Sequence, residues 1–409
     1  MLKEDMTENN NFNGDVDDET YDEELYQINS WDDIEMDNSI LRGIYSYGFE
    51  NPSPIQKKAI KPIIMGKDII AQAQSGTGKT AAFSVGALAC INLKENNTQV
   101  LVLSPTRELT VQTSNVMTSL GTMMKGLKIQ TLFGGSHYSN TDESFGESFK
   151  KQNPHVICGC PGRVFDMMRR EKITSKKIKL VILDEADEML SSGFKEQIYN
   201  IFQFFNSDIQ VALFSATLPS NIFTIVNKIM RDPVKIYVKA ELLTLEGIKQ
   251  FYVGVEDDKQ KYAVLKDLFK FISLSQCIIY CNSVKRVSDL YEAMKEDQFP
   301  VCCIHSSMEK VDRDASFLEF RNGKSRVLIS SNVTARGIDI QQVSTVINFD
   351  IPKDIHTYLH RIGRSGRWGR KGVGINFVTK RDINKLKDIE KYYACEINEL
   401  PNDLDFLQN

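Results

Sequence analysis

A loop of glycine, lysine and threonine has the residue types and spacing needed to bind phosphate. Residues 73–80 read Ala-Gln-Ser-Gly-Thr-Gly-Lys-Thr, follow an apolar stretch and lead into a plausible helix start. Glycines let backbone N–H groups turn toward a phosphate, and a helix dipole adds to the attraction. In this pattern Lys79 reaches the β- and γ-phosphates of a nucleotide and the Thr80 hydroxyl ligates Mg²⁺, whereas an ordinary glycine-rich turn is the alternative. The predicted nucleotide-binding residues of the loop are Gln74, Ser75, Gly76, Thr77, Gly78, Lys79 and Thr80.

Two carboxylates at the end of an apolar run form a second candidate group. Residues 180–183 read as a buried strand, and Asp184-Glu185-Ala186-Asp187 follows them. Ligands bind α/β sheets at the carboxyl ends of the strands. We predict that Asp184 holds the Mg²⁺ of the nucleotide and that Glu185 orients and deprotonates the attacking water. An acidic helix cap is the alternative for such residues taken alone, and the phosphate loop in the same chain favours catalysis.

Arginines alternate with glycines near the carboxyl end of the chain. Residues 360–367 read His-Arg-Ile-Gly-Arg-Ser-Gly-Arg, within a stretch at 355–381 that holds seven Lys or Arg and no Asp or Glu. One guanidinium group can donate two parallel hydrogen bonds to the oxygens of a phosphate. An arginine supplied to a γ-phosphate from another domain raises the rate of hydrolysis by ~10³–10⁵. We predict this role for Arg364 and Arg367, which requires two domains to close over ATP. A solvated basic face is the alternative.

Short apolar runs that alternate with longer helix-like stretches must position these groups. Several of these runs are fully apolar rather than alternating, which is typical of parallel strands covered by helices on both faces. Two sets of about six strands predict two α/β domains, and Asp232-Pro233 closes the first set. The expected strands are 68–72, 100–103, 128–133, 155–158, 180–183, 211–214, 249–255, 277–280, 301–304, 326–329, 345–349 and 374–378.

The charge is distributed unevenly along the 409 residues. Residues 1–37 hold fourteen Asp or Glu and one Lys, so they carry −13, while the remainder of the chain carries +9. The acidic tail is predicted to be disordered to about Glu24, as a solubilising leader or as a partner-binding or self-masking segment. The basic remainder leaves room for an anionic partner. No apolar stretch reaches ~18 residues, and the acidic amino terminus is wrong for a signal peptide.

The eight cysteines are dispersed, and none forms a C-x-x-C pair. Most lie in apolar, strand-like runs, and the five histidines are not spaced with them as zinc ligands. This pattern predicts reduced, buried thiols in an intracellular protein.

Taken in order, the motifs resemble those of the DEAD-box RNA helicases of superfamily 2, and most closely the translation initiation factor 4A group. The resemblance extends from about Trp31 to about Pro401. Residues 48–56 are similar to the Q motif, which implies that Gln56 reads the adenine edge and that Phe49 stacks on its ring. Trp31 matches the isolated aromatic upstream of that motif, although a hydrophobe packing at a domain edge has the same appearance. Residues 335–339, ending in Asp339, resemble the motif that touches both ribose and RNA.

The resemblance also implies residues that contact RNA and residues that couple its movement to hydrolysis. Ser215-Ala216-Thr217 is similar to the coupling motif, so Ser215 and Thr217 are the coupling residues. The implied RNA-binding residues are Pro105, Thr106, Arg107, Gly135, Pro161, Gly162, Arg163, Arg313, Ser331 and Arg336. The chain departs from the family pattern along this path and in the second domain. Cys160 replaces Thr, Lys310 replaces Gln, Thr110 replaces Ala, Ser306-Ser307 replaces Gly-Asp, and Ser331-Asn332 replaces Thr-Asp.

The family implies a fold of two RecA-like domains, each a parallel sheet flanked by helices. The expected boundaries are an acidic disordered tail at 1–27, the first domain at 28–236, a linker at 237–246 and the second domain at 247–409. The catalytic residues are then Lys79, Asp184, Glu185, Arg364 and Arg367. The cofactors are ATP and Mg²⁺, with Thr80 and Asp184 holding the metal partly through water.

The activity implied by the resemblance is an ATP-dependent RNA helicase that unwinds or remodels short RNA duplexes and RNA–protein complexes in translation initiation. The alternative is an ATP-locked RNA clamp in a scaffolded complex of the splicing or ribosome-biogenesis type. The expected partners are single-stranded RNA, bound through its backbone without sequence preference, and a helical-repeat scaffold protein. A monomer without membrane contact is expected, in the cytoplasm, with a nuclear pool left open.

Overall fold

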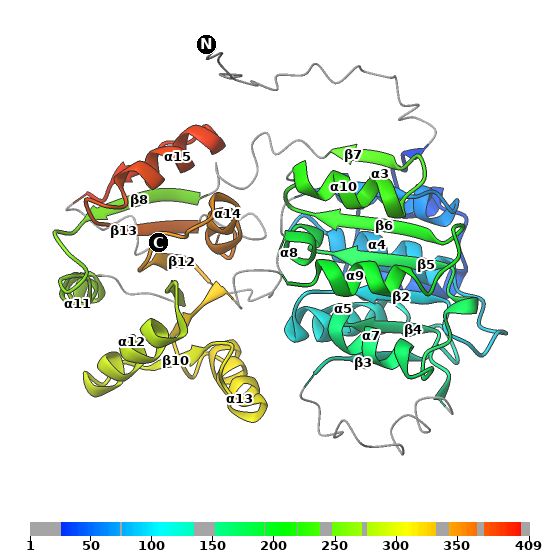
Figure 1. Ribbon diagram of the computed structural model, residues 1–409, viewed down its shortest axis with the longest axis horizontal. Helices are drawn as coiled ribbons and strands as arrows, with labels where there is room; N and C mark the ends of the chain where they lie inside the picture. Colours follow the sequence, from blue (N-terminus) through cyan, green and yellow to red (C-terminus); the bar gives the residue numbers. More distant parts are fainter. Residues whose placement is uncertain are drawn as a thin grey trace, which may run out of the picture.

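The computed structural model describes two α/β domains that lie side by side (Figure 1). The described residues are 26–73, 76–134, 152–191, 193–218, 220–237, 248–271, 276–332, 343–365 and 372–401. Each domain contains a parallel sheet with helices packed on its faces. The predicted fold class is confirmed.

The first sheet has the strand order β3-β4-β2-β5-β6-β1-β7, and all its pairs are parallel. Its strands are β1 (Ile69–Gln72), β2 (Val100–Leu103), β3 (Ile129–Leu132), β4 (Val156–Gly159), β5 (Leu180–Asp184), β6 (Gln210–Ser215) and β7 (Val234–Tyr237). Successive side chains of β1 alternate between two cores, with Ile69 and Ala71 in one and Ile70 in the other. The sheet is therefore apolar on both faces, and polar side chains gather where its strands end.

Helices cover both faces of this sheet (Figure 1). They are η1 (Trp31–Asp33), α2 (Asn38–Ser46), α3 (Pro54–Ile64), α4 (Lys79–Ala89), α5 (Arg107–Leu120), α7 (Pro161–Arg169), η2 (Ser175–Lys177), α8 (Ala186–Ser191), α9 (Lys195–Phe202) and α10 (Ser220–Ile229). Because each crossover returns a strand in the same direction, the helices α4, α5, α7 and α8 all begin at the carboxyl edge of the sheet.

The second domain repeats this plan, with the strand order β10-β11-β9-β12-β13-β8-β14. Its strands are β8 (Ile248–Gly254), β9 (Cys277–Tyr280), β10 (Val301–Ile304), β11 (Val327–Ser330), β12 (Thr345–Asn348), β13 (Gly372–Val378) and β14 (Asn398–Glu399). Its helices are α11 (Lys261–Phe271), α12 (Val284–Glu296), α13 (Lys310–Arg321), α14 (Ile355–Ile362) and α15 (Ile383–Tyr393). Polar groups again follow the ends of β9, β11 and β12.

Two strands are present that the sequence did not predict. β7 follows Asp232-Pro233, where the first set of strands was expected to close, and β14 is only two residues long. Since β7 ends at Tyr237, the expected linker begins on the last residue of a strand. Residues 238–247 and the tail to residue 25 lie outside the described residues. The predicted tail, linker and domain limits therefore stay predictions.

All eight cysteines are free, as expected. Five of them are buried, and burial raises the pKa of the Cys158 thiol to about 12. The thiols are therefore neutral near pH 7. Within the parts of the chain that the structure describes, no helix has the length and apolarity needed to cross a bilayer.

Candidate nucleotide and RNA sites

The phosphate loop connects β1 to α4, as its pattern predicts. Gly76 and Gly78 have φ values of +85° and +100°, which residues other than glycine rarely adopt. A Cβ atom on Gly78 would lie 2.6 Å from the Gln56 Nε2 atom, so this position has no room for one. Lys79 is the first residue of α4, and its buried Nζ donates to the Ala73 carbonyl (2.7 Å), while Thr80 follows it on the helix. Gln74 and Ser75 lie outside the described residues.

Gln56 joins the predicted adenine-binding segment to the phosphate loop. The Ser53 N–H donates to Gln56 Oε1 (2.7 Å) in a capping box at the start of α3. Gln56 Nε2 donates to the Gly78 carbonyl (3.3 Å), and the side chain is only 3% exposed. A change at Gln56 would therefore disturb the phosphate loop as well as any contact with a base.

Three aromatic rings lie together near the predicted adenine-binding segment. The Phe49 ring is 4.8 Å from that of Tyr47 and 6.3 Å from that of Trp31, measured between centroids. Trp31 is 1% exposed and belongs to the core of the first domain. Trp31 thus stacks on the half-buried Phe49 and also packs in the hydrophobic core, as the alternative interpretation of this residue expected.

The acidic segment begins at the end of β5, at the carboxyl edge of the sheet. Asp184, Glu185 and Asp187 are each at most 3% exposed. Asp184 Oδ1 accepts a hydrogen bond from the Glu185 N–H (3.0 Å), and the Glu185 Oε1 atom lies 4.0 Å from Lys79 Nζ. Glu185 Oε2 is buried without a hydrogen-bond partner. The phosphate loop and the carboxylates therefore meet, as the two motifs predict.

The electrostatics of this segment fit a hard divalent cation. Burial raises the pKa of Asp184, the charge of Glu185 raises it further, and Lys79 opposes the shift. Asp184 and Glu185 are both buried near Lys79, so one lysine faces two carboxylates. Carboxylate and hydroxyl oxygens are the ligands that Mg²⁺ prefers. The Asp184 carboxylate and the hydroxyl of Thr80, the residue after Lys79, offer such oxygens and suit the predicted metal.

Asp187, which our sequence prediction did not include among the site residues, connects the acidic segment to β6. The Thr217 Oγ1 donates to Asp187 Oδ2 (2.7 Å), and the Asp187 N–H donates to Ser215 Oγ (3.2 Å). Ser215 Oγ itself donates to the Thr217 carbonyl (2.6 Å). The two predicted coupling residues therefore contact the segment that carries the catalytic carboxylates.

A contact between the domains completes this cluster. His360 Nε2, near the end of α14, lies 3.1 Å from Asp187 Oδ2, and both side chains are almost fully buried. Arg364 is 2% exposed, and its Nε donates to the His360 carbonyl (3.1 Å). The arginine-rich segment of the second domain thus reaches the catalytic edge of the first. Arg367 lies outside the described residues.

The predicted RNA-binding residues of the first domain lie at the starts of two helices. Thr106 caps α5, with its side chain accepting from the Leu109 N–H (3.3 Å). Pro161 is the first residue of α7, and Gly162 is exposed, with open space for 4 Å around the point where a Cβ atom would lie. Both helices begin at the carboxyl ends of strands, so their positive dipole ends and free N–H groups suit phosphates.

Arginines flank these helix starts. The Arg107 Nη2 donates to the Gly134 carbonyl (2.6 Å), while Arg163 pairs with Asp166 at 3.3 Å. Arg313 of α13 forms an ion pair of 2.8 Å with Glu108 of α5, which crosses between the domains. Pro105, which precedes the capping residue of α5, is buried. The predicted residues Gly135, Arg336 and Asp339 lie outside the described residues.

Two departures from the family pattern contact each other. Cys160 Sγ lies 3.5 Å from Thr110 Oγ1, and burial raises the pKa of this thiol to about 11. Both replacements therefore form one neutral pair at the start of α7. Of Lys310 only the backbone is described.

A third departure is integrated into a hydrogen-bond network of the second domain. Asn332 Oδ1 accepts from the Arg361 Nε (3.0 Å) and Nη2 (2.6 Å), directly after the half-buried Ser331. Arg361 is fully buried and also donates to Asn282 Oδ1 (2.8 Å) and Asn348 Oδ1 (3.2 Å). Burial lowers the pKa of the guanidinium to about 10. Arg361 ties the ends of β9, β11 and β12 to α14 through neutral acceptors.

The motif patterns missed Glu108, His360, Arg361 and Asp187 as site residues. His360 and Arg361 precede the predicted arginine fingers, and Asp187 belongs to the acidic segment, so adjacency was the available signal. Nothing in the spacing links Glu108 to Arg313, which are more than 200 positions apart.

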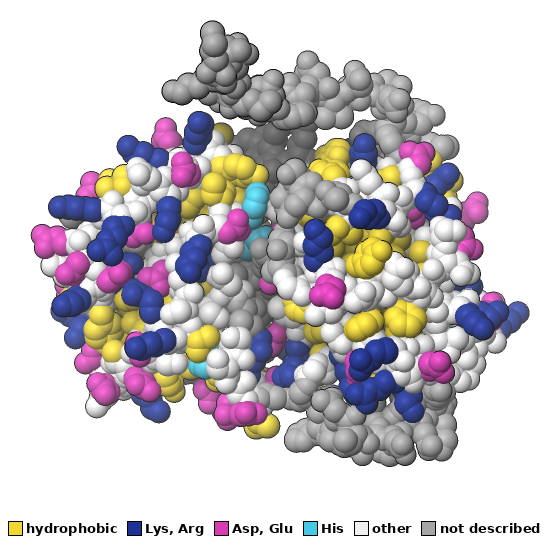
Figure 2. All heavy atoms as spheres, in the orientation of Figure 1, with side chains coloured by type: hydrophobic (Ala, Val, Ile, Leu, Met, Phe, Trp, Pro, Cys, Tyr) yellow, Lys and Arg dark blue, Asp and Glu magenta, His cyan; other side chains and the backbone are white. Residues whose placement is uncertain are grey.

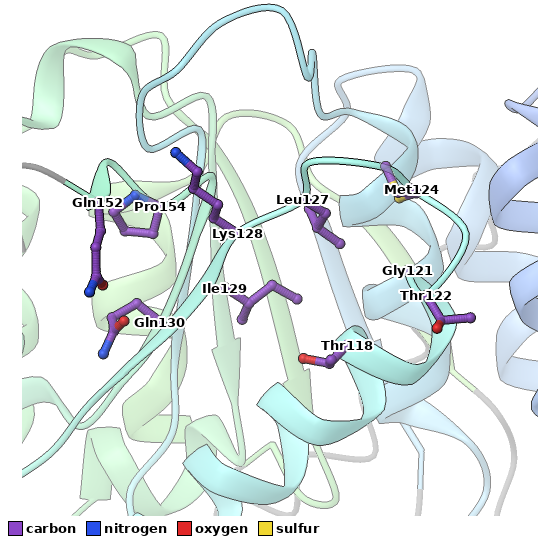
Figure 3. A pocket seen from close by; sticks show the side chains of 10 residues that line it. All are labelled: Thr118, Gly121, Thr122, Met124, Leu127, Lys128, Ile129, Gln130, Gln152 and Pro154. Atoms are coloured by element: carbon purple, nitrogen blue, oxygen red, sulfur yellow. The ribbon is translucent and has the colours of Figure 1, made fainter.

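A cavity of about 510 Å³ lies outside this site (Figure 3). Its lining includes Thr118 at the end of α5, Met124 in the following turn, Lys128 before β3 and Gln152. These residues lie at the amino end of β3, whereas the nucleotide and RNA residues lie at the carboxyl ends of the strands. The cavity takes no part in the predicted chemistry.

Two family models match this chain. The DEAD/DEAH box helicase model matches residues 53–225, and the helicase conserved C-terminal domain model matches residues 260–369. Eukaryotic initiation factor 4A of Caenorhabditis elegans is 49% identical over 377 residues, which are 92% of each chain. The ATP-dependent RNA helicase eIF4A of Saccharomyces cerevisiae is 48% identical over 95% of this chain and 96% of its own.

Solved structures agree with this placement. S. cerevisiae Dbp5 bound to RNA and ADP BeF3 is 36% identical and superposes with a TM-score of 0.85, covering 93% of this chain and 98% of Dbp5. Mss116 bound to single-stranded RNA and AMP-PNP is 26% identical with a TM-score of 0.81, covering 91% of this chain and 78% of its own. The chain belongs to the DEAD-box ATP-dependent RNA helicases, within their initiation factor 4A group.

Proposed function

We propose that this DEAD-box protein hydrolyses ATP to unwind or remodel short RNA duplexes and RNA–protein complexes in translation initiation. The contact between His360 and Asp187 is the observation that carries the proposal. It joins the arginine-rich end of α14 to the acidic segment 184–187, which lies beside Lys79 of the phosphate loop. Residues for ATP hydrolysis from the two domains are therefore close together.

ATP binds between the domains in this proposal. The phosphate loop cradles the phosphates, Lys79 and Arg364 neutralise the charge that develops on the γ-phosphoryl group, and Arg367 joins them. Phe49 and Gln56 hold the adenine. Glu185 positions the attacking water and accepts its proton, which its unpartnered Oε2 is free to do. Asp339 contacts the ribose.

Asp184 and Thr80 would hold Mg²⁺, which neutralises phosphate charge when it is bound. The residues of this chain then supply the rest. The Lys79 ammonium lies 4.0 Å from Glu185 Oε1 and so holds this carboxylate beside the phosphate loop. Asp187 holds Ser215 and Thr217, so a shift of the acidic segment is transmitted to β6.

RNA binds across both domains, on the residues proposed from the family resemblance. The ion pair between Glu108 and Arg313 supports this arrangement, because it closes the domains beside the start of α5. The similarity to Dbp5 also supports it. The TM-score is 0.85 for the complex with RNA and ADP BeF3, and 0.62 for Dbp5 bound to Nup159, Gle1, IP6 and ADP, at nearly the same coverage. Closure favours both ligands at once, so each raises the affinity for the other.

The setting of this activity is also proposed. The relatives named above are initiation factors or eIF4A helicases, which supports translation initiation as the setting. A helical-repeat scaffold protein as partner and the cytoplasm as location are proposed from the family resemblance alone. We propose that the protein works as a monomer, with a nuclear pool as a second location.

The test is steady-state ATP hydrolysis with and without single-stranded RNA, at low fixed salt because phosphate contacts are salt-sensitive. Stimulation by RNA and not by a DNA oligonucleotide of equal length is expected. Absence of stimulation with intact ATP binding would overturn the coupled enzyme. If RNA does not stimulate hydrolysis and is released slowly in the presence of ATP, the protein would be the ATP-locked clamp. The similarity to initiation factors does not favour that alternative.

The arginine assignment needs its own control. Arg364→Ala is expected to lose turnover while retaining nucleotide binding, because the guanidinium stabilises charge that develops during hydrolysis. Arg169→Ala removes an exposed arginine of the first domain and is expected to leave turnover unchanged. Equal turnover in both variants would refute the role of Arg364.

A further inference from the structure

The described surface begins at Tyr26, beside a small basic cavity at the end of the first sheet. This cavity has a volume of about 40 Å³, and Tyr26, Lys58, Lys235 and Tyr237 line it with no carboxylate among the lining residues. β7 is the last strand in the order of the first sheet and pairs only with β1 among the described strands. Lys235 and Tyr237 are the exposed residues of β7. We call this surface the β7 edge.

The chain that leads into the β7 edge is strongly acidic. Residues 1–25 hold ten Asp or Glu and one Lys. Seven of those carboxylates fall within ten positions and end two residues before Tyr26. They are Asp15, Asp17, Asp18, Glu19, Asp22, Glu23 and Glu24. The acidic run therefore enters the fold at a cavity that presents two lysines.

We propose that the acidic run 15–24 docks on the β7 edge of its own domain, against Lys58 and Lys235. The anchor at Tyr26 supports this choice, since a tethered segment has an effective concentration in the millimolar range. Further lysines of α3, Lys57 and Lys61, are half-buried beside Lys58 on the helix that packs against β7. Lys61 lies near Asp33 of η1, so part of its charge is offset there, and Lys57 is the neighbour of Lys58 that adds to the positive charge of this edge.

The wider surface makes a local basic site distinctive. On the face shown in Figure 2, positive and negative side chains are interspersed over both domains. The basic residues of the RNA path include Arg313 and Arg163, which already pair with carboxylates. The lining of the cavity beside Tyr26 holds two lysines and no carboxylate, so an acidic segment anchored there has a basic site close to its attachment.

The docked segment would also occupy a position with consequences. Tyr237 lies in the same cavity as Tyr26 and is the last described residue before the connection between the domains. An exposed end strand is also a template for pairing with another chain, and charged segments block such pairing. The tail thus covers an end strand and touches the root of the interdomain connection.

Zero-length carbodiimide coupling of the full chain tests the contact directly, because it joins only carboxylates and amines that are close. Peptides linking residues 15–24 to Lys58 or Lys235 are expected to dominate at 50 mM salt. Their yield should fall at least about fivefold in 1 M salt, where charges beyond ~3 Å are screened. Dominant links to other lysines would overturn the proposal.

Hydrogen exchange of β7 is the second readout. A variant with the seven carboxylates changed to Asn or Gln alters no described residue, so its fold is retained. Exchange at 234–237 is expected to be at least about threefold faster in it than in the parent chain. Lys58→Glu with Lys235→Glu should reproduce the change. The matched pair Lys125→Glu with Lys176→Glu, which alters exposed lysines elsewhere in this domain, should not. Equal exchange in the parent and neutral-tail proteins would refute the docking.

RNA affinity separates this proposal from a tail that imitates RNA. Deleting residues 1–24 is expected to change the RNA dissociation constant by less than about twofold, because the β7 edge lies apart from the RNA residues. A gain of about tenfold would locate the tail on the RNA path and would overturn the proposal. This measurement alone depends on the proposed RNA binding, whereas coupling and exchange do not.

Discussion

Glu185 has a backbone conformation that costs energy at the residue expected to handle the attacking water. Its φ is +51°, in the left-handed region that residues other than glycine rarely adopt. The Glu185 N–H donates to the Asp184 carboxylate, and Lys79 attracts its side chain, so the surroundings hold this conformation. At the scale of single residues the site is thus defined by strain and unmet charge, which are features of preorganised catalytic groups.

Glu185→Gln tests that assignment. The amide keeps the volume of the side chain and cannot accept the proton of water, so turnover should fall by ~10²–10⁴-fold while the ATP dissociation constant changes little. Phosphate release and nucleotide binding measure the two effects. Glu196→Gln, on the exposed side of α9, should leave both unchanged. Near-normal hydrolysis in Glu185→Gln would remove Glu185 from the mechanism.

Asn332 offers a second prediction at this scale. Asn332→Ala would remove the acceptor of two Arg361 hydrogen bonds and leave part of a buried guanidinium unpartnered, at a cost of about 1–3 kcal/mol in unfolding free energy. Asn332→Asp keeps an acceptor and should retain stability. Urea unfolding, with exchange of β11 peptides as the local probe, measures both. An unchanged midpoint for the alanine variant would show that the network is not needed.

Elements with like roles recur in the two domains. In each, a parallel sheet presents polar side chains at its carboxyl edge, and the next helix begins there. α4 carries Lys79, α5 carries Arg107 and α14 leads to Arg364. Because successive parallel strands share one direction, residues far apart in the chain meet at one edge. The strand order decides which of them are neighbours.

The start of β4 should make the first domain sensitive to acid. His155 is 2% exposed, and its Nδ1 accepts from the Lys128 N–H (3.1 Å) beside β3. Burial lowers the pKa of His155 from its usual value of 6.5, so the unfolded chain binds this proton more readily than the folded one. Stability is then complete above 6.5 and falls as the pH drops from 6.5 toward the folded value.

Urea unfolding of the first domain between about pH 5 and 8 measures this effect. His155→Gln retains an acceptor for Lys128 and removes the titration, so it should flatten the slope, which one proton limits to about 1.4 kcal/mol per pH unit. His305 in the second domain also has a lowered pKa, so only the difference between variant and parent is informative. Parallel pH profiles for the two proteins would refute the role of His155.

At the scale of the whole molecule, the described residues include two side-chain contacts that join the domains at the carboxyl edges of the sheets. One is the hydrogen bond between His360 and Asp187 near the nucleotide residues, and the other is the ion pair between Arg313 and Glu108 near the RNA residues. Closure therefore serves both ligand sites together. This geometry gives a physical basis for coupling between ATP and RNA.

Glu108→Gln should weaken that coupling. The ion pair is partly exposed and forms only across closed domains, so the factor by which an ATP analogue raises RNA affinity should fall about two- to tenfold. RNA affinity without nucleotide should not change, since the open protein lacks the pair. Fluorescence anisotropy with and without the analogue gives both values. An equal loss in both conditions would indicate a direct RNA contact instead.

Short stretches of this sequence were enough to predict the local chemistry. The glycines of the phosphate loop, the carboxylates after an apolar strand and the alternation of strands and helices all express preferences over a few neighbouring residues. They sufficed to predict two parallel α/β domains and the residues at their edges. β7 was missed because Asp232-Pro233 predicts an end, whereas pairing with β1 extends the sheet by one strand.

Which of these residues meet across the molecule depends on the tertiary structure alone. Asp187 contacts His360, Glu108 pairs with Arg313, and Asn332 accepts from Arg361. The spacing of these residues in the chain predicts none of the three contacts. The reason is physical. Each pair depends on strand order and on how two separately folded sheets face each other, and both are set by packing summed over many residues.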